Sequence, residues 1–222
     1  MRFRIVTFLL IFCMISASLS YADSQGLDWS NTESPSPSSS SSPLFHFSDV
    51  EFRISGTSNV RDWDIVSDTL GGIIRLGPAY TQPDENSGNP AQWIEEVYLY
   101  IPNHSLESGI RMMNQTMNQS LESETYAKLE YRMTNIVDML ADSGSEEQGF
   151  IVNGVVGAAG SEYELEHEVY VRQLSGETFR IFGDFEMNMT DLGIEPPTFM
   201  RGALTTTDAV RVDYNFTVTF ED

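Results

Sequence analysis

Apolar and polar residues alternate with a period of two along much of the chain beyond residue 44. The alternation is clearest over 209–220, where polar residues separate a regular series of apolar ones. The apolar series comprises Val210, Val212, Tyr214, Phe216, Val218 and Phe220. A period of two is the spacing of a β-strand with one dry face, so the sequence predicts such a strand here.

Similar runs predict further strands, which we expect at 49–55, 59–65, 70–76, 93–101, 128–140, 150–156, 162–172 and 178–189. Several of the segments between them are rich in Gly, Pro, Asn or Asp, as in turns between antiparallel strands. About eight or nine short strands in one domain predict an all-β fold, either a closed antiparallel barrel or a sandwich. Closure into a barrel would remove the exposed edges of the sheet.

One segment departs from this pattern and predicts a helix over 105–126. Its apolar residues Ile110, Met113, Met117 and Leu121 recur at helical spacing. The preceding strand, 93–101, has apolar residues on both of its faces, so one face needs a cover. We therefore expect the helix to pack against the second face of that strand.

The first 43 residues have a different character. Arg2 and Arg4 precede an apolar run, and a small-residue site ends at Ala22, which predicts a secretory signal peptide over 1–22. Residues 23–43 are rich in Ser and Pro and predict a solvated tether. The folded domain is expected over 44–222, and the protein is expected in the periplasm or outside the cell.

Acidic residues dominate the composition, with 33 Asp and Glu against 12 Lys and Arg, for a net charge of −21. Such a charge makes nucleic acid and anionic membranes poor partners. It favours solubility, and adaptation to high salt is a second interpretation. No stretch beyond the signal approaches the ~20 apolar residues of a membrane span.

Four stretches together resemble the YceI-like family of secreted polyisoprenoid-binding proteins with a lipocalin-like barrel. They are GTSNVRDW at 56–63, SLESGIRMMNQTMNQSL at 105–121, YAKLEY from 126, and MTDLGIEPPTFMRGALTTTDAV at 189–210. The resemblance covers roughly 47–220, and its last motif is the most specific. It implies an antiparallel barrel whose apolar tunnel holds a long ligand, such as a polyisoprenoid, a quinone-like molecule or a fatty chain.

A set of mainly apolar residues is expected to point into this barrel and contact the ligand. The set comprises Phe52, Ile54, Val97, Leu99, Ile101, Phe179, Ile181, Phe185, Tyr214 and Phe216. Met112, Met113 and Met117 are candidates for an adaptable gate, because thioethers repack around varied shapes. Trp63 is a candidate at the mouth, and His167 lies on the dry side of its strand. Ordinary core packing is the alternative for these residues, except at Trp63, where the alternative is a surface ion pair between the preceding Arg61 and Asp62.

Catalysis has little support in the sequence. His46, His104 and His167 are widely separated, and the sequence contains no nucleophile motif, phosphate loop or metal-ligand spacing. We therefore expect a non-catalytic carrier that uses no metal or cofactor.

The alternative function is an interaction or stress-related domain whose barrel is filled with side chains. Ile94, Tyr98, Tyr100 and Phe182 would then contact a partner or form a homodimer.

Overall fold

The computed structural model describes residues 44–77, 94–140, 147–199 and 203–221. The signal peptide and the tether predicted for residues 1–43 lie outside the described residues. The described strands are β1 Leu44–Ser58, β2 Trp63–Ser67, β3 Gly71–Leu76, β4 Ile94–Pro102, β5 Lys128–Met139, β6 Glu147–Ala158, β7 Ser161–Ser175, β8 Thr178–Asn188, β9 Thr198–Phe199 and β10 Leu204–Glu221. The helical elements are η3 Asn103–Ser105, α2 Arg111–Ser120 and η4 Met189–Leu192.

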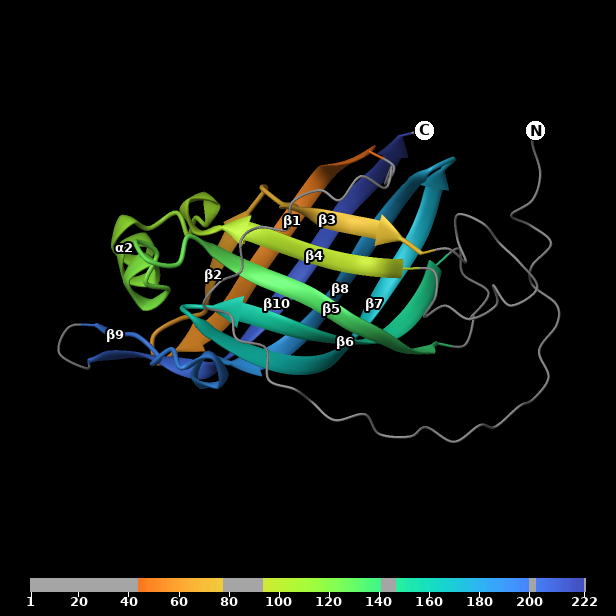
Figure 1. Cartoon of the computed structure of the whole chain (residues 1–222). Helices are drawn as coiled ribbons and strands as arrows, with labels where there is room; N and C mark the ends of the chain where they lie inside the picture. Colours follow the sequence, from red (N-terminus) through yellow and green to blue (C-terminus); the bar gives the residue numbers. More distant parts are fainter. Residues whose placement is uncertain (1–43, 78–93, 141–146, 200–202, 222) are drawn as a thin grey trace, which may run out of the picture. The chain divides into compact units, whose positions relative to one another are not determined.

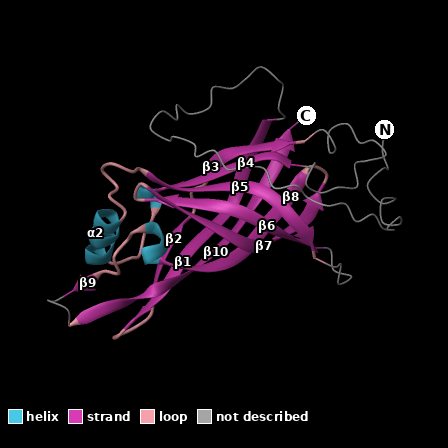
Figure 2. Ribbon diagram, turned by 60° about the horizontal axis from the view of Figure 1, so that its bottom comes forward, coloured by secondary structure: helices cyan, strands magenta, loops and turns pink. Residues whose placement is uncertain are grey.

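The strands pair in one antiparallel sheet with the order β2-β1-β10-β8-β7-β6-β5-β4-β3, and β9 pairs only with β10. The sheet curls on itself, with α2 at one end of the strands (Figures 1 and 2). The all-β, antiparallel, lipocalin-like fold, with one α-helix among the described residues, is therefore confirmed. The predicted strands are all present within a few residues of their expected bounds. The short β9 was not predicted.

The connection between β2 and β3 explains why the sheet curls. These strands form opposite edges of the sheet, yet only residues 68–70 separate them in the sequence. Such a short link spans at most about 15 Å, so the two edges must approach each other at this end. Val66 of β2 also exchanges two backbone hydrogen bonds of 2.9 Å with Glu107, which follows η3. These hydrogen bonds join the β2 edge to the segment that follows β4 and η3.

The concave face of the sheet carries two apolar clusters. The buried members of the first cluster are Ile65, Ile101, Leu106, Met117, Leu121, Ala158, Met187, Leu192, Ile194 and Val210. The buried members of the second are Ile74, Val218 and Phe220. Val210 and Val218 share one face of β10 and are eight residues apart, or about 27 Å along an extended strand. The clusters therefore occupy opposite ends of the same concave face.

The position of α2 differs from the prediction. Met117 and Leu121 pack in the first cluster with Ile101, which is on the concave face of β4. The helix therefore covers one end of the curled sheet, and the expectation that it covers the second face of β4 was wrong. It is also shorter than predicted, at 10 residues. None of the described helices is long and apolar enough to cross a membrane.

Another group covers the outer face of β4. The Nζ atom of Lys128 lies 5.2 Å from the ring centroids of both Tyr98 and Tyr100, within the range of a cation–π contact. The Tyr98 hydroxyl also donates a hydrogen bond to Glu130. Tyrosine rings tolerate this partly exposed setting because the phenol is polar. The apolar appearance of both faces of β4 therefore arises from tyrosines that have surface partners.

Candidate ligand-binding site

Three polar aromatic side chains meet at the middle of the concave face, between the two apolar clusters. Tyr131 comes from β5, His167 from β7 and Tyr214 from β10, and we call them the His–Tyr cluster. The Tyr131 hydroxyl lies 2.9 Å from His167 Nε2, and the Tyr214 hydroxyl lies 3.4 Å from Nδ1. The ring of Phe185 lies beside the imidazole, with centroids 5.3 Å apart. Along β10, Tyr214 is midway between Val210 and Val218.

Two glycines make room for the tyrosines. Gly183 of β8 pairs directly with Tyr214, and a Cβ atom at Gly183 would lie 2.5 Å from the Tyr214 hydroxyl. A Cβ atom at Gly154 of β6 would lie 2.4 Å from the Tyr131 ring. Because β8 and β6 separate the three strands that carry the cluster, polar side chains and glycines alternate across five neighbouring strands. Each tyrosine can thus lean over a glycine toward His167.

The hydrogen bonds determine which imidazole nitrogen carries the proton. The ring has a hydrogen bond with the backbone of Glu168 that favours the charged imidazole, so the acceptor is the carbonyl oxygen. The same oxygen lies 3.5 Å from the Tyr214 hydroxyl, on the Nδ1 side of the ring. We therefore assign the proton to Nδ1, which leaves Nε2 to accept from the Tyr131 hydroxyl.

Burial keeps this cluster uncharged. Desolvation lowers the pKa of His167 below its usual value of 6.5, and the bond to the Glu168 backbone opposes this shift only in part. Burial also raises the pKa of Tyr131 and that of Tyr214. The imidazole and both phenols are therefore neutral at pH 7.

The predicted ligand residues lie on this concave face, in two groups. The first cluster contains or contacts Phe52, Ile54, Trp63, Ile101, Met113, Met117 and Phe185. The second contacts Val97, Leu99, Phe179 and Ile181. Phe216 is buried next to Phe47, and Tyr214 and His167 belong to the His–Tyr cluster. Whether any of them contacts a ligand stays a prediction.

Many of these side chains are only half-buried. The half-buried apolar set comprises Phe52, Ile54, Val97, Leu99, Phe179, Ile181 and Phe185. Side chains that filled the space between the strands completely would close one another off from solvent. The concave face therefore retains apolar surface that a guest molecule can cover.

Sequence reasoning missed Tyr131, although it is on the same face of β5 as Leu129 and Met133. The pairing of β5 with β6 shifts its register after Met133 and again after Ile136. Each bulge inserts a residue and reverses the alternation beyond it. The period-two signal over 128–140 is therefore broken, and the inward face could not be identified from alternation alone.

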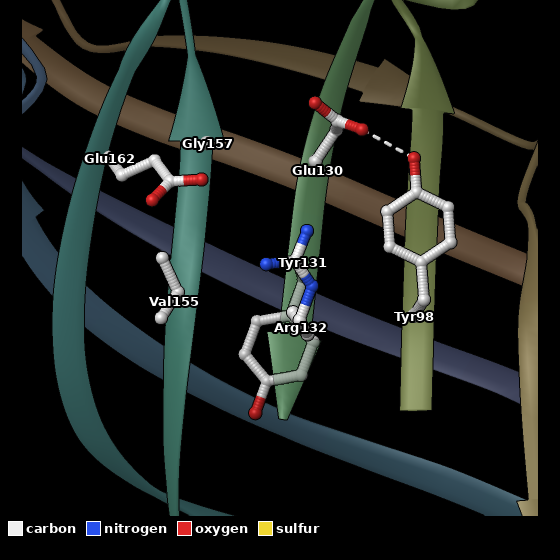
Figure 3. Close-up of a pocket in the computed structure, with 7 residues that line it drawn as sticks. All are labelled: Tyr98, Glu130, Tyr131, Arg132, Val155, Gly157 and Glu162. Atoms are coloured by element: carbon white, nitrogen blue, oxygen red, sulfur yellow. Dashed lines mark hydrogen bonds between the residues drawn. The ribbon is translucent and has the colours of Figure 1, made fainter. Parts of the chain in front are cut away.

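A second, small depression lies on the outer side of the sheet, over β4 to β7 (Figure 3). Its lining consists of Tyr98, Glu130, Tyr131, Arg132, Val155, Gly157 and Glu162. Polar and charged groups dominate it, so it does not suit a long apolar molecule. Across the described residues, no group of three or more His, Cys, Asp and Glu side chains could hold a metal ion.

Three of the four residues proposed as partner contacts have partners within the chain. Tyr98 and Tyr100 contact Lys128. Phe182 stacks on Tyr170, with ring centroids 5.7 Å apart and an interplanar angle of 19°. These contacts account for the outward aromatic residues and do not specifically favour a partner or a homodimer.

No family model and no curated protein matches the sequence. Solved structures do match the fold. A polyisoprenoid-binding domain from Saccharophagus degradans, implicated in plant cell wall breakdown, has a TM-score of 0.59 and 16% identity, covering 80% of this chain and 99% of that one. BcnA from Burkholderia cenocepacia has a TM-score of 0.55 and 15% identity, covering 76% of this chain and 95% of BcnA. The YceI protein of Campylobacter jejuni has a TM-score of 0.52 and 10% identity, covering 71% of this chain and 84% of the YceI protein.

The chain has the YceI-like fold. The likeness extends over most of each chain, so it includes the curled sheet that carries the His–Tyr cluster. Identities of 10–16% support the shared YceI-like fold and do not transfer a ligand to this protein.

The glycine next to Tyr131 provides a matched test of this packing. Gly154→Ala should lower the free energy of unfolding by about 1–3 kcal/mol, because the new methyl group displaces the Tyr131 ring. Gly157→Ala, on the outer face of the same strand, meets its nearest atom at an ordinary 3.6 Å and should leave stability unchanged or slightly raised. Urea denaturation of both variants measures the difference. Equal effects would contradict the placement of Tyr131 over Gly154.

The lowered pKa of His167 predicts a pH dependence of stability. The unfolded chain binds this proton near pH 6.5 and the folded chain only at lower pH. The free energy of unfolding of the wild type should therefore fall as the pH drops from 7 through 6.5, until the folded pKa is reached. His167→Gln should lack this component. The difference in the free energy of unfolding between the wild type and the variant should therefore change between pH 7 and pH 5. If the free energies of unfolding of the two proteins changed in parallel with pH, the predicted lowering of the His167 pKa on folding would be contradicted.

Proposed function

We propose that this protein is an exported, non-catalytic carrier that sequesters a long apolar molecule against the concave face of its sheet. The observation that carries the proposal is the arrangement of the apolar surface. Two clusters, whose members Val210 and Val218 lie about 27 Å apart along β10, are connected by half-buried apolar side chains from several strands. A long, narrow guest matches this surface better than a compact one.

Burial supplies enough energy for such binding. Each buried methylene contributes about 0.8 kcal/mol, so about twenty carbons contribute roughly 16 kcal/mol before costs. Association costs are of the order of 4–15 kcal/mol. A chain of this length can therefore bind without any ionic contact. The polyisoprenoid-binding domain from Saccharophagus degradans supports a polyisoprenoid as the first guest to test.

Export is part of the proposal. The basic residues, apolar run and small-residue site over 1–22 support removal of a signal peptide and delivery to the periplasm or the extracellular space. The excess of acidic residues would keep the loaded carrier dispersed. On β7, for example, the exposed side chains of Glu162, Glu164, Glu166 and Glu168 alternate with inward ones.

The test is native mass spectrometry of protein purified without detergent, followed by extraction of bound lipid. Two neighbouring valines of β6 give a matched pair, because Val156 packs on the first cluster and Val155 lines the outer depression. Val156→Glu should lose the bound mass, since it places a charge on the apolar face, whereas Val155→Glu should keep it. Circular dichroism verifies that the variants fold. Val156→Thr and Val155→Thr form a second matched pair, which introduces a hydroxyl group instead of a charge. An empty wild type with no affinity for prenyl or acyl chains would contradict the proposal.

A further inference from the structure

The His–Tyr cluster is more than an apolar carrier requires. An apolar chain needs only apolar surface, and a polar group in such surroundings lowers stability unless it is hydrogen-bonded. Here three strands contribute polar side chains, and two further strands contribute glycines that admit them. The three side chains lie midway between the two clusters, where a guest that spans them would pass. The cluster is therefore placed to contact a polar group on the guest.

The hydrogen-bond arrangement determines what kind of group fits. Tyr131 donates its hydroxyl hydrogen to His167 Nε2. His167 Nδ1 and the Tyr214 hydroxyl both point toward the Glu168 carbonyl oxygen. Each of the three hydrogens thus has an acceptor within the cluster, and the Tyr214 hydroxyl makes the longest of these contacts, at 3.5 Å. What remains is the acceptor capacity of the two phenolic oxygens, because a hydroxyl oxygen has two lone pairs.

The surroundings of the cluster disfavour an anionic head group. His167 faces Tyr131, Tyr214, the Phe185 ring and the backbone of Glu168. None of these groups is a cation, and the hydrogens that they carry are directed at acceptors within the cluster. A buried anion without such partners is strongly disfavoured. Tyr131 and Tyr214 are half-buried as whole residues, so a guest that lies along the concave face contacts them.

We propose that the guest is an apolar chain carrying a neutral hydroxyl group, whose hydrogen it donates to a tyrosine oxygen of the His–Tyr cluster. This inference rests on the proposed carrier function and names the class of its ligand, an alcohol or a phenol. An ether or a hydrocarbon of the same length lacks the hydrogen. A fatty acid anion would have to leave its charge unpaired.

The experiment compares the affinities of hexadecan-1-ol and its methyl ether, measured by displacement of a fluorescent apolar dye. The wild type should bind the alcohol about 2- to 10-fold more tightly, the value of one hydrogen bond. The triple variant Tyr131→Phe, His167→Leu, Tyr214→Phe should bind both probes equally. The three substitutions replace every polar side chain of the network by an apolar one and leave only the Glu168 carbonyl oxygen without its donors, so we expect the variant to fold with a modest loss of stability. Tyr170→Phe, on the outer face, should behave like the wild type.

The outcomes separate the two proposals. Equal binding of both probes by the wild type, or a preference that persists in the triple variant, would overturn the inference and leave the carrier function standing. Failure of the wild type to bind either probe would contradict the carrier function and the inference with it. If the triple variant does not fold, the wild-type ratio of the two affinities decides.

Discussion

The short link between β2 and β3 is the constraint on which the rest of the structure depends. These strands are opposite edges of the sheet and only residues 68–70 connect them, so the sheet has to curl until its edges approach. Curling gives every strand a concave side, and the period-two pattern assigns the apolar residues to it. Met117 and Leu121 of the helical region then cover one end of that face. A single hydrophobic surface results, assembled from residues that are far apart in the sequence.

Within this surface, small residues matter as much as large ones. Gly183 and Gly154 leave the space into which Tyr214 and Tyr131 lean, so two tyrosines and a histidine meet at the centre. Desolvation keeps all three uncharged, because it lowers the pKa of the imidazole and raises those of the phenols. The concave face is thus apolar at both ends and polar, but neutral, in the middle.

Much of the fold could be predicted from the sequence, because alternation is a local property. The strand over 209–220 and its inward residues follow from the period of two alone. The position of α2 does not, since the apolar side of a helix cannot reveal which surface it covers. The sequence predicted only two of the three residues of the His–Tyr cluster. Tyr214 and His167 lie in regular strands, but two bulges conceal the inward face around Tyr131, and the part played by Gly154 depends on a neighbour across the sheet.

The central claim is that the concave face holds an elongated guest that spans the two apolar clusters and passes the His–Tyr cluster. A crystal structure of protein purified without detergent from the cells that make it tests this claim most directly. The account predicts continuous density along the concave face between the clusters, with a polar atom at hydrogen-bonding distance from Tyr131 or Tyr214. A concave face closed by its own side chains, with no density between the clusters, would contradict it.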